Sequence, residues 1–175
     1  MAQAHRLKLP SASPRRQAEN KAKWNKERSA EQAHFFTLGY TGRSMAELLE
    51  ALTDAGVRSL IDIRQYAVSM YRPELSKANL KRAVEKRGLQ YVHWPEFGVP
   101  RDIRAKAIEA GKRDVIWEWY DKHVVEPHFG RNLHHFLNSL DHPVALMCVE
   151  VDPQECHRHR LSLALETRGL RGFDL

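Results

Sequence analysis

Short apolar runs alternate with amphipathic helical stretches along most of this chain, and that alternation limits the possible fold more than any other feature. The apolar runs cover Phe35–Leu38, Val57–Ile63, Leu89–His93 and Pro143–Val149. Helical patterns begin at Ser44, at Ser76, after Pro100 (with breaks near Gly111 and Pro127) and at Asp152. Strands that alternate with helices of about ten to fifteen residues form parallel sheets. The predicted fold is α/β: a three-layer sandwich with helices on both faces of a mainly parallel sheet of about four to five strands, the last within Leu170–Leu175.

Residues 1–33 differ from the rest of the chain. They contain eight lysines and arginines against three glutamates, so they carry +5 of the net charge of +6. Because they hold few large apolar side chains, they cannot bury enough surface to offset the entropy lost on ordering. We expect a basic, flexible N-terminal arm, with a helix within Gln17–Gln32 anchored by Trp24, followed by a single α/β domain over residues 34–175. The arm is either a tail that contacts nucleic acid or a solvated extension.

The bulk properties indicate the setting in which the protein works. No apolar run approaches the roughly 20 residues of a membrane helix, and the basic N-terminus lacks the apolar centre of a signal peptide. We therefore expect a cytoplasmic protein with no membrane partner, in which the two cysteines are thiols. The positive charge favours an anionic small molecule or nucleic acid as partner, although charge of this size also serves solubility. The sequence predicts no oligomeric state.

The segment Val144–Leu161, VALMCVEVDPQECHRHRL, concentrates reactive side chains where a predicted strand leads into a helix. Ligand and catalytic groups gather at such strand ends in open α/β folds. Cys148 and Glu150 are two residues apart, so their side chains point the same way from an extended chain. We place Cys156 in the first turn of the helix, where the helix dipole and His157 favour a thiolate. In the alternative interpretation these residues are buried and only support the start of the helix.

Two known cysteine mechanisms fit this segment poorly. At the spacing that a thiolate phosphatase needs between cysteine and arginine, Cys148 is followed by Gln154 and Cys156 by Ser162. The residues after Cys148 are acidic and apolar, unlike the loop of a rhodanese, although the strand LIDIR at Leu60–Arg64 makes a distant rhodanese-like fold plausible. Histidines two positions apart on a helix diverge by about 200°, so we assign no metal site and no cofactor.

Polar residues also follow the other predicted strands. Arginines there could clamp an anion, and tyrosines could stack on a base, at the edge where parallel strands end. Two alternatives remain open, since Asp62 and Arg64 also suit a structural ion pair and Glu96 also suits a solvated loop. The predicted substrate-binding residues are Tyr40, Arg43, Arg64, Tyr71, Arg72, Glu96, Cys148 and Arg158.

Several of these stretches together resemble a known family. The stretches are TLGYTGRS at Thr37–Ser44, LIDIR at Leu60–Arg64, SMYRPELSK at Ser69–Lys77, YVHWPEFG at Tyr91–Gly98 and ALMCVEVDPQECHR at Ala145–Arg158. In this order they resemble the bacterial and archaeal domain of unknown function 488 family, over about residues 36–175. The resemblance implies a compact α/β domain whose polar motif residues gather at one site. It implies no settled activity, although some members look associated with nucleic-acid processing.

We therefore hypothesise an enzyme that binds an anionic, nucleotide-like or nucleic-acid-linked substrate in an Arg/Glu/Cys/His pocket at the carboxyl ends of the strands. The predicted catalytic residues are Cys156 as nucleophile or anion ligand, Glu150 as general acid or base, and His157 assisting. One alternative is a non-catalytic nucleic-acid-binding accessory module. A third possibility is a thiol-based redox protein or sulfur carrier.

Overall fold

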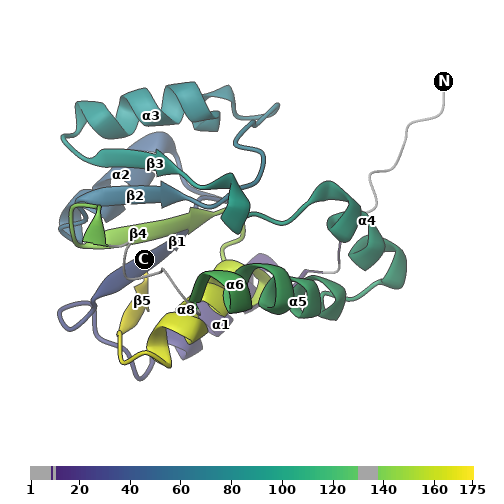
Figure 1. The fold of residues 1–175 in the computed structure, drawn as a ribbon. Coiled ribbons are helices and arrows are strands. Elements are labelled where there is room, and N and C mark those ends of the chain that lie inside the picture. Colours follow the sequence, from purple (N-terminus) through teal and green to yellow (C-terminus); the bar gives the residue numbers. More distant parts are fainter. Residues whose placement is uncertain (1–8, 10, 130–137) are drawn as a thin grey trace.

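A parallel sheet forms the centre of the molecule in the computed structural model, which describes residues 9, 11–129 and 138–175 (Figure 1). Within those residues the sheet has five strands in the order β3-β2-β4-β1-β5, and every neighbouring pair is parallel. All carboxyl ends therefore lie along one edge, as the alternating pattern predicts. The strands are β1 (Phe35–Gly39), β2 (Ser59–Asp62), β3 (Gln90–His93), β4 (Val144–Cys148) and β5 (Gly172–Asp174).

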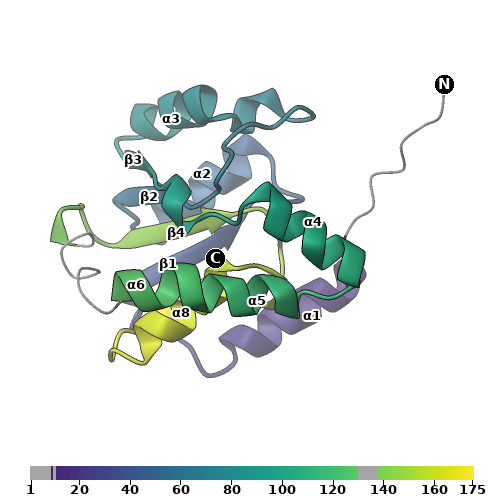
Figure 2. The same cartoon turned by 45° about the vertical axis from the view of Figure 1, so that its right-hand side comes forward.

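Helices cover both faces of the sheet, so the three-layer α/β prediction is confirmed (Figures 1 and 2). Successive strand residues point to opposite faces: Phe35 and Leu146 join one apolar core, Phe36 and Met147 the other. The second core packs against α2 (Met45–Asp54) and α3 (Lys77–Lys86), and the first against α4 (Arg101–Ala110), α5 (Asp114–Tyr120) and α8 (Arg158–Glu166). Cys148 belongs to the first core, so its side chain faces α5 and α8.

Local sequence signals explain where several elements begin. Ser44 and Glu47 form the predicted capping box of α2, with both reciprocal hydrogen bonds present. Ser76 precedes α3 as predicted, but its hydroxyl accepts from the Ser69 amide and makes no cap bond to the helix. The short 3-10 turns η1 (Pro73–Leu75) and η2 (Pro95–Phe97) follow β2 and β3 at the carboxyl edge.

The region after Pro100 departs from the predicted break at Pro127. Helix α4 ends at Gly111 in the left-handed conformation, as expected from a glycine stop. Helix α5, however, continues through a π-helical stretch, η3 (Asp121–Val125), into α6 (Glu126–Phe129), which contains Pro127. A proline lacks an N–H and its ring collides with the carbonyl four residues earlier, so a wider turn just before it keeps the helix continuous. Part of the helix predicted to reach Leu140 lies outside the described residues.

The last predicted helix is wrong at its start. Asp152 accepts a hydrogen bond from the Gln154 amide at 2.9 Å, but the turn that it caps is η4 (Pro153–Glu155), a 3-10 helix. Cys156 then adopts an extended conformation, and α8 begins two residues later. Cys156 therefore lies before the helix, outside its first turn.

The N-terminal segment contains a helix, α1 (Pro14–Asn25), that contacts β5 and η4. The amide of Asn20 donates to Asp152 at 2.7 Å, and Arg28 forms an ion pair with Glu166 at 2.9 Å. Trp24 packs edge-on against His159, which agrees with its predicted role as an anchor. The described part of the expected flexible arm is thus folded against the sheet, while the division into an arm and a domain stays a prediction. None of the helices in the described ranges combines the length and the apolar character needed to cross a membrane.

Candidate functional site

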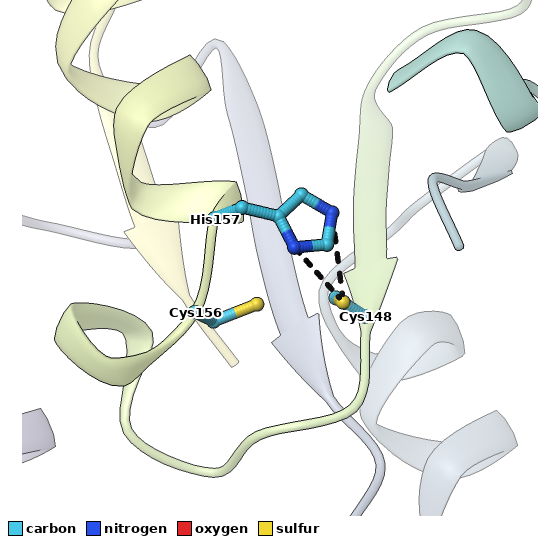
Figure 3. A group of neighbouring side chains, drawn as sticks. All are labelled: Cys148, Cys156 and His157. Carbon is cyan, nitrogen blue, oxygen red and sulfur yellow. Dashed lines mark hydrogen bonds between the residues drawn. The ribbon is translucent and has the colours of Figure 1, made fainter. Parts of the chain in front are cut away.

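Cys148, Cys156 and His157 come together at the carboxyl edge of the sheet (Figure 3). Cys148 is the last residue of β4, and the turn through η4 brings Cys156 and His157 back beside it. The two sulfurs and a ring nitrogen of His157 all lie within 4.8 Å of one another. The three residues are 0%, 1% and 3% exposed, respectively. The predicted gathering of these residues is therefore present, but they lie beneath the surface.

Contacts on both sides fix the ring of His157. Its Nε2 lies 3.3 Å from the carbonyl oxygen of Ile63, and Tyr120 packs against the ring at 5.1 Å between centroids. Because a carbonyl can only accept, Nε2 carries the proton and donates it to Ile63. Nδ1 and Nε2 lie 3.7 and 3.8 Å from Sγ of Cys148, so the sulfur sits beside the edge of the ring between the two nitrogens.

Glu150 connects this cluster to the surface. It is half-buried, and its Oε2 lies 3.8 Å from Sγ of Cys148. Burial raises the pKa of Glu150, but the nearby positive charge of Arg104 and the interaction with His157 outweigh burial, so the pKa lies below its ordinary value. Glu150 is therefore ionised at neutral pH, which leaves it able to accept a proton but not to act as a general acid, and its acid–base role stays a prediction.

The thiolate predicted for Cys156 is not supported by its surroundings. Burial raises the pKa of the Cys156 thiol well above its ordinary value, and its contact with Cys148 raises it further. The expectation relied on a position in the first turn of a helix, which Cys156 does not occupy. Its role as a nucleophile stays a prediction.

Arg158 holds the backbone beside the site and does not reach solvent. Its side chain is 0% exposed and forms an ion pair with the equally buried Asp174 at 3.1 Å. Its Nη1 and Nη2 donate to the carbonyls of Glu150 and Val151 at 2.5 and 2.9 Å. Gly39 completes this packing, because a Cβ there would lie 1.7 Å from the Glu150 carbonyl oxygen. The substrate-binding role predicted for Arg158 therefore gives way to a positioning role.

Arg64 is likewise committed to the protein interior. It donates to both carboxylate oxygens of Asp62 at 2.8 and 2.6 Å and to the Leu75 carbonyl at 2.9 Å, which supports the structural alternative for this pair. The hydroxyl of Tyr91 also donates to Asp62 at 2.7 Å. Tyr40 lies under the Arg64 guanidinium, 5.3 Å from its ring centroid.

The remaining predicted residues spread along the edge. Arg43 donates to the carbonyl of Leu175, and Arg72 binds Glu74 at 2.9 Å. Tyr71 is 86% exposed, and Glu96 is exposed too. The structure thus unites Cys148, Glu150, Cys156, His157 and Arg158, and leaves Arg43, Tyr71, Arg72 and Glu96 outside that group.

A pocket of about 390 Å³ opens beside Glu150. Arg104, Arg113 and Glu155 line it together with Leu9, Ser11, Gln17, Thr41, Ile108 and Val151. An adjoining space of about 30 Å³ shares Arg104, Arg113 and Glu150 and reaches His157. Another cavity of about 370 Å³, beside Arg28 and Glu166, contains none of the cluster residues. The pocket beside Glu150 is therefore the candidate substrate site.

Sequence reasoning missed the two arginines of this pocket. Arg104 lies in α4 and Arg113 immediately before α5, in a region without a recognisable motif. Arg104 donates to the Val99 carbonyl at 3.3 Å, and Arg113 donates to the Glu155 carbonyl at 2.8 Å. Nothing local in the sequence distinguishes them from other surface arginines.

Comparison with known proteins decides the family. The sequence profile described as "Domain of unknown function DUF488" matches residues 44–165, more than half of the chain. The protein belongs to the DUF488 family. The match is narrower than the predicted range 36–175, since it omits β1 and β5, but it includes Cys148, Glu150, Cys156 and His157. No curated protein and no solved structure matches the chain, so the distant likeness to rhodaneses is not confirmed.

Proposed function

We propose that this DUF488 protein is an enzyme that acts on a small anionic, nucleotide-like substrate bound in the pocket beside Glu150. The observation that carries the proposal is the position of Glu150. Its carboxylate lines the pocket and also lies 3.8 Å from Sγ of Cys148, so it connects the open pocket with the buried cluster. A carboxylate at such a junction can pass a proton to or from a bound substrate.

Arginines other than the predicted ones bind the anion in this proposal. Arg64 and Arg158 each pair with a buried carboxylate and line neither the pocket nor its inner extension, whereas Arg104 lines both. A guanidinium at the wall of a partly enclosed site suits a phosphate or carboxylate group of a substrate. His157, which lines the inner extension, stays oriented by Ile63 and assists Glu150.

The enzyme is favoured over the accessory module because the arm uses part of its charge internally. Lys21 binds the Leu175 carbonyl and lies 3.6 Å from Asp174, and Arg28 pairs with Glu166. These two cations are turned inward, which weakens the case for the arm as a tail devoted to nucleic acid.

Binding and turnover test the proposal separately. Calorimetry measures the binding of nucleoside monophosphates, inorganic phosphate and a short single-stranded RNA to the full chain and to two variants. The variants are Arg104→Gln and, as a control, Lys106→Gln, which changes an exposed residue of the same helix. We expect a mononucleotide to bind, Arg104→Gln to weaken it about 10- to 100-fold through loss of a charged hydrogen bond, and Lys106→Gln to leave it unchanged. Incubation with the bound nucleotide, followed by mass spectrometry, should give a product with the wild type and none with Glu150→Gln.

Two results would overturn the proposal. In the first, only RNA binds, with an affinity that falls steeply with salt and does not depend on Arg104, which is the behaviour of an accessory module. In the second, the nucleotide binds but the wild type yields no product, or Glu150→Gln yields as much product as the wild type.

A further inference from the structure

The buried group Cys148, Cys156 and His157 has the chemistry of a transition-metal site. Two thiols and an imidazole are the donors that zinc and other soft or borderline metals prefer. Three such donors converge here from the end of β4 and from the turn before α8. They are the two cysteines of the chain and a buried histidine.

The distances between the donors suit tetrahedral coordination. With Zn–S bonds of about 2.3 Å and Zn–N bonds of about 2.0–2.1 Å, a tetrahedron places two sulfurs about 3.8 Å apart and a sulfur about 3.6 Å from a nitrogen. Sγ of Cys148 lies 3.7 Å from Nδ1 of His157, and every pair in the group lies within 4.8 Å. Adjustments of about 1 Å or less would therefore give a common centre.

The surroundings of His157 match those of a metal-bound histidine. A ligating imidazole usually donates its other N–H to a carbonyl or carboxylate, which fixes the tautomer and the orientation of the ring. Here Nε2 faces the Ile63 carbonyl at 3.3 Å, so Nδ1 is the nitrogen available to a metal, although both nitrogens lie 3.7–3.8 Å from Sγ of Cys148. Tyr120 packs on the ring and limits its rotation.

A metal held by these three donors would have its fourth position on the side of Glu150 and the inner extension of the pocket. Glu150 lies 3.8 Å from Cys148, and the inner extension of the pocket reaches both Glu150 and His157. Two cysteines and one histidine with an open fourth position form a known class of catalytic zinc site, in which the remaining position takes water or substrate. The buried guanidinium of Arg158 donates to the Glu150 carbonyl, and its positive charge would partly balance that of two metal-bound thiolates.

We propose that Cys148, Cys156 and His157 bind one zinc ion whose fourth coordination position opens toward the pocket beside Glu150. On binding, each thiol gives up its proton, so two protons leave for each Zn²⁺ that enters, and His157 binds as neutral imidazole. The binding step stands on the donor set alone. Only its consequence for catalysis, activation of a water for Glu150 to deprotonate, rests on the proposed function.

The test needs no substrate. The full chain is purified with a reductant, stripped with a chelator and titrated with Co²⁺ and then with Zn²⁺, against a chromophoric chelator as competitor. We expect one ion per chain, a thiolate-to-cobalt charge-transfer band, and the intense visible bands of tetrahedral cobalt, all lost when Zn²⁺ displaces Co²⁺. Cys148→Ser, Cys156→Ser and His157→Asn should each weaken zinc binding at least about 100-fold. The exposed His123→Gln should bind like the wild type.

Some results on the wild type contradict the metal site whether or not the variants fold. If the wild type binds no stoichiometric metal, or binds cobalt without a thiolate band, the site is wrong even where a serine variant fails to fold. Free thiols are also counted on the unfolded protein after reduction and exposure to air in the presence of zinc. If Cys148 and Cys156 form a disulfide again instead of binding zinc, the metal site is wrong and a redox role is favoured. Zinc binding without nucleotide binding contradicts only the proposed function, and nucleotide binding without zinc binding contradicts only the metal site.

Discussion

Replacing Arg158 by methionine should destabilise the protein far more than the same change at Arg160, two residues along the same helix. Arg158 and Asp174 are both 0% exposed and paired at 3.1 Å, and Thr37 also donates to Asp174 at 2.5 Å. The pair of Arg160 with Asp121 is 30% and 36% exposed. The two variants remove the same chemical group from very different surroundings.

The expected magnitudes follow from burial. Removing one partner of a buried ion pair costs about 3–5 kcal/mol where the other charge stays behind without compensation. Lys21, 3.6 Å from Asp174, retains part of that compensation here and places the cost toward the lower end. Arg158→Met also leaves the carbonyls of Glu150 and Val151 without donors, at about 1 kcal/mol or more each where water cannot reach them. We therefore expect a loss of at least about 4 kcal/mol, although methionine retains much of the apolar stem. Arg160→Met should cost less than about 1 kcal/mol.

Urea unfolding followed by circular dichroism gives the free energy of unfolding of each variant. A typical domain has a free energy of unfolding of about 5–15 kcal/mol, so losses of this size can be measured. Asp174→Asn and the double variant with Arg158→Met complete a mutant cycle, in which we expect the double variant to lose less than the sum of the single losses. Equal costs for Arg158→Met and Arg160→Met, or additive losses in the cycle, would refute the conclusion that Arg158 is a buried structural residue. Arg158 would then return to the list of anion-binding candidates.

Three further predictions test other parts of the fold. Gly39→Ala places a methyl group 1.7 Å from the Glu150 carbonyl oxygen, so it should cost about 1–3 kcal/mol or more in urea unfolding. Burial lowers the pKa of His159 below its ordinary value of 6.5, so the unfolded chain binds more protons. Stability should therefore fall as the pH drops below about 6.5, and His159→Gln should flatten that slope. Tyr91→Phe removes a donor to the buried Asp62 carboxylate and should lower the free energy of unfolding by about 1.5–3 kcal/mol.

Sequence reasoning located the strands well because their signals are local. A buried parallel strand is a short apolar run, and Gly56 and Gly88 stop the helices that precede two of them. The last strand is predicted within Leu170–Leu175, and β5 pairs there with β1 at the edge of the sheet. Apolar spacing and stop residues depend on near neighbours, so they can be read from the chain itself.

The functions of the arginines could not be predicted in the same way. Arginine is seldom buried, so arginines at a strand edge were assigned to an anion. Arg158 instead finds its carboxylate in Asp174, at the end of a short strand whose neighbour in the sheet is β1. This ion pair depends on how β5 packs in the folded protein, and no residue spacing in the sequence predicts it. The same holds for Arg104, which α4 carries to the pocket from a region without a motif.

The N-terminal segment shows why charge counted along a chain is a poor guide to a binding surface. In the sequence it is a basic arm, yet Asn20, Lys21 and Arg28 hold α1 against the domain, and Ser11 and Gln17 line the pocket beside Glu150. Deleting the segment would therefore remove a wall of the candidate site together with the charge. A loss of nucleic-acid binding after such a deletion would not separate the two roles, because the same cut would damage the substrate pocket. Only substitutions of cations on the outward face of α1 change the charge and leave that wall in place.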